Sequence, residues 1–224
     1  MAGIYSPSEV KTFQSYTIRH SCENDAYRII KNRPLGAGFY GYVFEACPLS
    51  LLKNGLPSKC QFVVKVIDLT HLEEKKIQKE LIISDMAGRL GVGPKIIDVW
   101  ICDNFPESRL FYEESEEELS LDVESKLPSG FEYPTWSKKS PYLFILMEKA
   151  PGETLMSYLK RNRYIVPEGL CEALDDAITK LFQAGIIYGD LHGENVLVEE
   201  QIMPDASVVP GASDESSWKV TILD

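Results

Sequence analysis

The sequence lacks the features that mark several specialised classes of protein. Its longest apolar stretches, such as residues 142–147, fall far short of the roughly 20 residues that a membrane-spanning helix requires. It has no Cys-x-x-Cys pair and only three histidines, so we expect no zinc site. The N-terminus has no basic patch followed by an apolar run. We therefore expect no secretory signal and a cytoplasmic or otherwise intracellular protein.

Positive charge is also scarce, with 23 Lys and Arg against 34 Asp and Glu and a net charge of −11. Nucleic acids and anionic membranes are themselves negative, so we expect neither as a partner. The five cysteines are odd in number and widely scattered. We expect them to be reduced and buried. A chain of 224 residues with 44% hydrophobic residues can bury a core without disulfide or metal staples.

Hydrophobic patterning divides the chain into a tail, residues 1–25, and two lobes. The first lobe, residues 26–149, is strand-rich, with a predicted antiparallel meander of three strands between residues 28 and 67. A helix is expected over 72–90, ended by Gly91 and Gly93. Two more strands, 96–101 and 142–147, flank an insertion that contains an acidic run and that we expect to be solvated.

The second lobe, residues 150–224, is mainly helical. Pro167 favours a helix start, and Gly185 favours its end. Between them an apolar stripe is expected to face one side, formed by Leu170, Leu174, Ile178, Leu181 and Phe182. Short strands are predicted over 196–198 and 218–223, joined by a polar loop. The fold class expected from this order is α+β.

The glycine cluster Gly36, Gly38 and Gly41, followed by Val43, fits the pattern G-x-G-x-x-G-x-V. Glycines at this spacing let backbone N–H groups close over phosphates without Cβ clashes. A strand-like segment follows the cluster, where a dinucleotide-binding fold would need a helix, so we predict a glycine hairpin. No Gly-Lys-Ser/Thr ending is present, which excludes the Walker loop.

Two charged residues lie on faces that are otherwise apolar. Lys65 shares a strand face with Val63 and Ile67, and Glu80 shares a helix face with Ile83 and Ala87. Because a buried charge needs an opposite partner, we predict an ion pair between Lys65 and Glu80. Glu73, two turns earlier on the same helix face, is the alternative partner.

The most specific segment runs from Ile186 to Val198 and contains Gly-Asp-Leu-His-Gly-Glu-Asn at residues 189–195. Together with the glycine hairpin, the strand lysine, the helix glutamate, a hinge-like Leu-Met-Glu-Lys-Ala and a final Ile-Leu-Asp, this segment resembles the protein-kinase-like superfamily. The resemblance covers residues 28–224. It implies a two-lobe kinase fold with a strand-rich N-lobe and a partial C-lobe.

The resemblance implies an ATP-dependent phosphotransferase that uses Mg²⁺ or Mn²⁺. Lys65 would grip the α- and β-phosphates, Glu80 would hold its ammonium, and Asp190 would orient the attacking hydroxyl or accept its proton. Hard oxygen ligands for the metal would come from Asn195 and Asp224. The remaining nucleotide contacts would come from Gly36, Gly38, Gly41 and Val43 around the phosphates, from Met147 behind the adenine, and from the backbones of Glu148 and Ala150.

The acceptor expected from the resemblance is a Ser/Thr hydroxyl of a protein. Gly-Asp-Leu-His is similar to the loop of aminoglycoside and other small-molecule kinases, so a small-molecule acceptor is the alternative. Tyr188 and Gly189 stand where protein kinases have His-Arg, and His192 stands where Ser/Thr kinases have Lys. The family continues past its metal-binding Asp, here Asp224, so a truncated nucleotide-binding scaffold with a partner over its C-lobe is another alternative.

Overall fold

The computed structural model describes residues 18–20, 22, 24, 26–38, 41–53, 57, 59–70, 72, 74–103, 110–112, 132, 134, 136, 140–189, 191–201 and 217–223. These residues form a mixed α+β structure with a curled, strand-rich sheet and few helices, as the patterning predicted. They fall into two compact units. The first unit comprises Ser8–Lys79 and Ile96–Lys149, and the second is built from Glu80–Lys95 and Ala150–Asp224.

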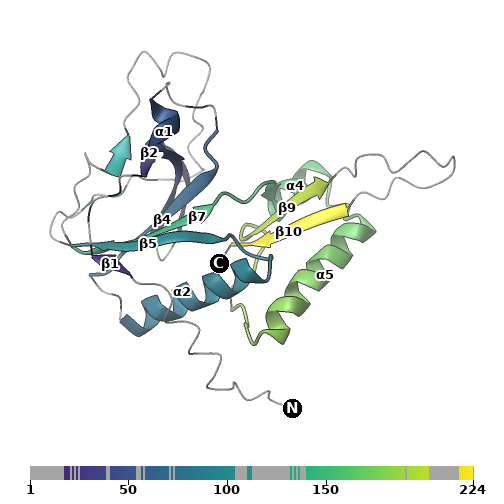
Figure 1. Ribbon diagram of the computed structural model, residues 1–224. Coiled ribbons are helices and arrows are strands. Elements are labelled where there is room, and N and C mark those ends of the chain that lie inside the picture. The colour runs from purple at the N-terminus through teal and green to yellow at the C-terminus, as the bar shows by residue number, and fades with distance from the viewer. Residues whose placement is uncertain are drawn as a thin grey trace. The chain divides into compact units, whose positions relative to one another are not determined.

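The first unit is built on a seven-stranded sheet in the order β1-β5-β7-β4-β3-β2-β6 (Figure 1). The predicted three-stranded meander is confirmed, because β2, β3 and β4 pair antiparallel in sequence order. The two later strands are confirmed as β5 and β7. The bounds are β1 Arg19–His20, β2 Tyr27–Gly38, β3 Gly41–Pro48, β4 Phe62–Asp68, β5 Ile96–Cys102, β6 Phe111–Tyr112 and β7 Tyr142–Glu148.

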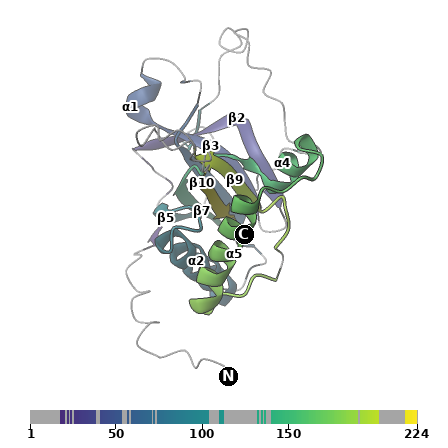
Figure 2. The ribbon, with the colours of Figure 1, turned by 90° about the vertical axis from the view of Figure 1, so that its right-hand side faces the viewer.

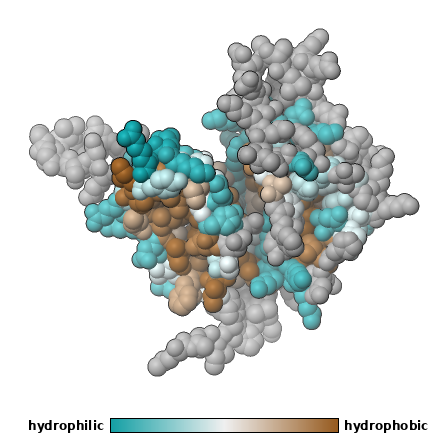
Figure 3. All heavy atoms as spheres, turned by 180° about the vertical axis from the view of Figure 1, so that it is seen from behind, coloured by the Kyte–Doolittle hydropathy of each residue, from teal (hydrophilic) through white to brown (hydrophobic). Residues whose placement is uncertain are grey.

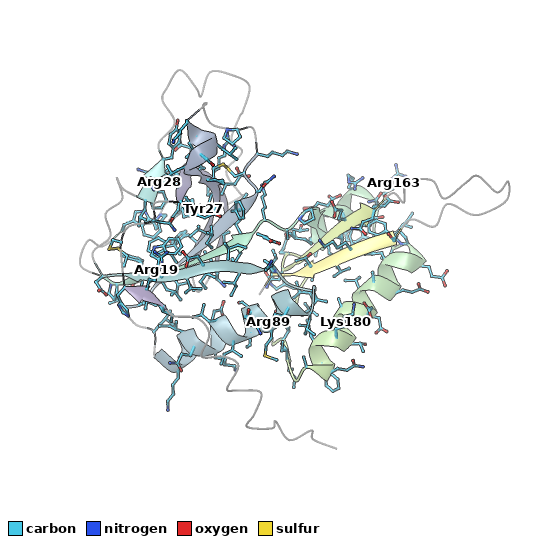
Figure 4. All side chains as sticks on the ribbon, viewed as in Figure 1. Arg19, Tyr27, Arg28, Arg89, Arg163 and Lys180 are labelled. Atoms are coloured by element: carbon cyan, nitrogen blue, oxygen red, sulfur yellow. A yellow bond between two sulfur atoms is a disulfide. The ribbon has the colours of Figure 1, made fainter. Side chains whose placement is uncertain are left out.

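One face of this sheet carries an aromatic core. Trp100 of β5 stacks on Phe144 of β7 with ring centroids 5.1 Å apart, and both are almost fully buried. Trp136 lies among four more rings, those of Tyr42, Phe44, Phe111 and Tyr142. At the end of the meander Tyr27, labelled in Figure 4, meets Phe62 edge to face. Because side chains alternate along a strand, the opposite face is left to the intervening residues.

Two disulfides correct the expectation of reduced, buried thiols. Cys22 is bonded to Cys102 of β5, and Cys47 of β3 is bonded to Cys60, just before β4. Their Cα atoms lie 4.6 and 5.1 Å apart, within the range that a disulfide can bridge. Strand pairing brings together cysteines that are distant in the sequence, which the scatter of the five residues concealed. Cys171 is a free thiol and is exposed.

The predicted helix over 72–90 is confirmed as α2, Glu74–Arg89. Its end is set by Gly91, which has a φ of 73°, and by Val92 and Gly93, whose N–H groups donate to the Ala87 carbonyl. A short helix, α1 Leu49–Leu52, lies between the second and third meander strands. Residues 71 and 73 lie outside the described part of the chain, and so does the acidic run at 113–118.

The second unit packs helices on a three-stranded antiparallel sheet in the order β10-β9-β8 (Figure 2). Its elements are β8 Glu153–Thr154, α4 Leu155–Arg161, α5 Glu168–Gln183, β9 Val196–Gln201 and β10 Ser217–Ile222. The predicted helix and both predicted strands are thus confirmed. The patterning missed α4, whose first turn is capped by the Thr154 hydroxyl, which accepts from the Ser157 N–H at 3.1 Å.

The apolar stripe predicted on α5 is only partly buried. Leu170, Ala177 and Leu181 enter the core of the second unit, with Leu174 partly buried against it. Ile178 is 43% exposed and Phe182 is 70% exposed, so these two members of the predicted stripe lie outside the buried face of α5. In Figure 3 hydrophobic side chains gather on the outside of the second unit, at the left of that view.

Among the described residues, no helix combines the length and the apolar character needed to cross a membrane.

Candidate functional site

The glycine cluster forms a β-hairpin, as predicted. Gly36 pairs with Val43, and Gly38 pairs with Gly41 across β2 and β3. Gly41 has a φ of 151°, and a Cβ there would overlap the carbonyl oxygen of Val66 on β4. Gly36 is different, because a Cβ added to it meets nothing within 4 Å. Gly41 is therefore required by packing, whereas packing does not explain the glycine at position 36.

This difference predicts two distinct outcomes of substitution. Gly41→Ala should lower the free energy of unfolding by about 2 kcal/mol or more, through backbone strain and the overlap with β4. Gly36→Ala, the matched control, should change it by no more than about 0.5 kcal/mol. If Gly36 lies over a phosphate, its substitution should weaken ATP binding while stability is kept. Chemical denaturation and an ATP titration of both variants measure this, and equal losses of stability would contradict the distinction.

Lys65 lies in the middle of β4 and is 7% exposed. Its register partners are Val43 of the glycine hairpin and Ile145 of β7, so the three side chains share one face of the sheet. The next row on that face holds Glu45, Val63 and Met147. The register thus brings together Lys65, Val43 and Met147, three predicted nucleotide contacts from separate segments of the chain.

Glu148 ends β7 and is followed by Lys149, whose N–H donates to the Gln61 carbonyl at 2.8 Å. The described part of the chain contains no cis peptide, and in a trans peptide the C=O points opposite to the N–H. The Glu148 carbonyl is therefore directed away from β4. This is the backbone group predicted to contact the adenine. Ala150, the other predicted adenine contact, is half-buried and belongs to the second unit.

The predicted ion pair between Lys65 and Glu80 joins residues of different units. Lys65 lies in the first unit, and Glu80 begins the α2 portion of the second. Glu80 is half-buried. The pair stays a prediction, and the alternative partner Glu73 lies outside the described residues.

The segment predicted to be the catalytic loop connects α5 to β9 in the second unit. Gly185, with a φ of 78°, ends α5, and buried Ile186 anchors the chain that follows. The Gly193 carbonyl accepts from the Met156 N–H at 2.9 Å, which ties the loop to the first turn of α4. A Cβ on Gly193 would come within 3.2 Å of that same nitrogen, so a small residue suits this contact. Asp190 lies outside the described residues.

Asn195, a predicted metal ligand, is held by backbone bonds on both sides. Its N–H donates to the His192 carbonyl at 2.9 Å, and its carbonyl accepts from the Leu223 N–H at 2.9 Å. The neighbouring Ile222 N–H donates to the Val92 carbonyl at 2.7 Å. These bonds fix Asn195 beside the residue that precedes Asp224. Asp224 itself lies outside the described part of the chain.

Among the described residues, no group of three or more His, Cys, Asp and Glu side chains could hold a metal ion. The predicted metal site consists of an amide and a carboxylate, Asn195 and Asp224. Only Asn195 is among the described residues, so the pair stays a prediction.

Sequence reasoning missed a charged cluster on the same sheet face as Lys65. Glu45 is 6% exposed, and its carboxylate bonds Lys149 and lies 3.4 Å from the Arg33 guanidinium. Alternation along β3 could have found it, since Glu45 shares a face with Val43. Only strand pairing shows that Lys149 and Arg33 meet there.

Protein-family models were scanned with this sequence and none matches, and a search of curated proteins by sequence finds no match.

Proposed function

We propose that this protein is an ATP-dependent phosphotransferase with a protein-kinase-like two-lobe fold, most simply a Ser/Thr protein kinase. The observation that carries the proposal is the placement of Lys65. A lysine 7% exposed in mid-sheet is uncommon, because burial of its charge is costly. Here it lies beside Val43 of a glycine hairpin. A buried lysine beside a glycine hairpin suits the binding of a triphosphate, which is anionic.

In the first unit, the glycine hairpin would cover the phosphates and Lys65 would neutralise their charge. Met147 would close the back of the adenine pocket, and the Glu148 carbonyl would accept from the base. Each of these roles requires a group held in advance, because phosphoryl transfer depends on positioning and charge neutralisation. The sheet register supplies that rigidity, since it places the residues on paired strands.

In the second unit, Asn195 and Asp224 fit a magnesium ion by donor chemistry, because amide and carboxylate oxygens are hard ligands. The metal would neutralise phosphate charge, and Asp190 would orient the acceptor hydroxyl. The backbone bonds between Asn195, His192 and Leu223 support this role, since they hold the amide ligand at a fixed place beside the end of β10.

The acceptor hydroxyl distinguishes three candidate functions. A protein hydroxyl is the first candidate, and the Gly-Asp-Leu-His sequence favours a small-molecule hydroxyl as the second. A scaffold that binds nucleotide without transfer is the third. As such a scaffold, the protein would bind a partner over the exposed α5 residues Ile178 and Phe182. The compartment proposed is intracellular, and the two disulfides favour an oxidising compartment within the cell.

ATP binding gives the direct test. We expect Mg²⁺ with ATP to raise the melting temperature, because a ligand that binds only the folded state stabilises it by about 2.7 kcal/mol at a hundredfold excess over Kd. ATP with EDTA should give a smaller rise, and Lys65→Met should lose most of the effect of Mg²⁺ and ATP. A thermal-shift titration measures all three.

The control for Lys65→Met is Lys180→Met on α5. Lys180 is exposed and pairs with Asp176 across one turn at 2.6 Å (Figure 4). Lys180→Met should leave the ligand-induced rise in melting temperature unchanged, because exposed ion pairs contribute little to stability. Equal shifts with and without EDTA would argue against a metal-assisted site, and no shift under any condition would refute the proposed function.

A further inference from the structure

We propose that Glu45 is a positioning residue which, through Lys149, aims the Glu148 carbonyl at the nucleotide base and thereby sets a preference for ATP over GTP. The inference rests on the proposed function, because it concerns the base-binding part of that same site. Nothing in the sequence pattern alone assigns a role to Glu45.

The burial of Glu45 requires an explanation. Its side chain is 7% exposed in the sheet, and a buried carboxylate is costly unless it is paired and hydrogen-bonded. Two cations meet it, Lys149 and Arg33, whose side chains are 31% and 12% exposed. Arg33 also donates to the Pro57 carbonyl at 2.8 Å, so its guanidinium is itself fixed. Glu45 is therefore a fixed anchor for Lys149.

Lys149 is held at two points, and both lie next to the predicted base contact. Its ammonium bonds Glu45 of β3, and its N–H bonds the Gln61 carbonyl. That N–H belongs to the same peptide as the Glu148 carbonyl. A rigid, planar trans peptide transmits the constraint, so fixing Lys149 sets the direction in which the Glu148 oxygen points.

A carbonyl oxygen distinguishes the two purines by hydrogen bonding. Adenine offers an amino group at its N6 position, which donates, whereas guanine has the O6 acceptor at the equivalent place. A well-aimed carbonyl favours adenine and repels guanine. A loosened one loses that discrimination, although the phosphate contacts remain.

The test compares the Kd values of Mg²⁺-ATP and Mg²⁺-GTP for wild type, Glu45→Gln and Lys149→Met. We expect Glu45→Gln to weaken ATP binding about tenfold through loss of an aimed hydrogen bond, and to leave GTP binding unchanged or tighter because the repulsion of guanine is relieved. Lys149→Met should do the same, and the double variant should add little, because the two residues act as one unit. Asp98→Asn, which breaks the more exposed Arg19 pair of the same sheet, is the matched control and should leave the ratio unchanged.

Two readouts separate this role from a purely structural one. The Kd for GTP divided by the Kd for ATP should fall in Glu45→Gln. The Lys149 backbone amide should also exchange its hydrogen about tenfold faster. An unaltered ratio in a folded, ATP-binding Glu45→Gln variant would overturn the inference. If that variant does not fold, Lys149→Met decides, since its side chain is partly exposed. Failure of wild type to bind ATP would instead refute the proposed function, and the inference with it.

Discussion

Asp190→Asn is expected to reduce phosphate transfer by about 10²–10⁴-fold in the intact protein, which is the range over which a positioned general base acts. The substitution keeps the shape of the side chain and removes its ability to accept a proton. ATP affinity should change by no more than about twofold, because Asp190 would serve the acceptor hydroxyl and not the adenine or the phosphates. The measurement is radiolabelled transfer to Ser/Thr peptides and to small-molecule hydroxyl acceptors, beside the ATP affinity.

The control for this variant is Asp176→Asn, an exposed carboxylate on α5 that pairs with Lys180. It should leave both transfer and affinity unchanged. Transfer that persists in Asp190→Asn would falsify the catalytic assignment. Transfer that is absent in wild type, together with normal ATP binding, would favour the nucleotide-binding scaffold. Which acceptor is labelled distinguishes a protein kinase from a small-molecule kinase.

Loss of the disulfides is expected to have the largest effect on stability. Chain-entropy arguments give about 4 kcal/mol for a loop such as that of Cys22 and Cys102, and about 3 kcal/mol for one such as that of Cys47 and Cys60. The sequence separations are 80 and 13 residues. Replacing Cys22 and Cys102 by Ser should therefore lower the melting temperature by about 8–16 °C in a chain of this size. Excess dithiothreitol should have an effect at least as large.

Cys171→Ser is the matched control, since that thiol is exposed and free, and it should shift the melting temperature by no more than about 1 °C. Thiol titration of the denatured protein without reductant should count a single reactive group. After reduction it should count all five cysteines of the sequence. Five reactive thiols before reduction would contradict both disulfides and would point to a reducing compartment.

Local patterning was sufficient for most of the longer elements. Alternation, short apolar runs and helical periodicity predicted β2 to β5, β7, α2, α5, β9 and β10, because each signal lies in the element's own residues. The same argument predicted the glycine hairpin, where a strand follows the glycines. Short elements were missed for the same reason. β1, β6 and β8 have two residues each, too few to show a period.

The apolar pattern of α5 does not fix which of its residues are buried. A helix with apolar residues on more than one side can turn several of them inward, and the sequence does not say which. In the second unit the side chains of Leu170, Ala177 and Leu181 are buried. Ile178 and Phe182 are left exposed because the described packing partners of α5 lie on its other side.

The sequence by itself determined the strand and helix pattern, the hairpin geometry of the glycine cluster, and the anomalous burial of Lys65, because each depends on residues close together along the chain. The tertiary structure alone decided which distant residues meet. It paired four cysteines in two disulfides, placed Lys65 beside Val43, set Leu223 against Asn195, and joined Glu45 to Lys149 and Arg33. Strand register controls such contacts, and register depends on the packing of the whole sheet, since a slip of one residue would exchange its two faces.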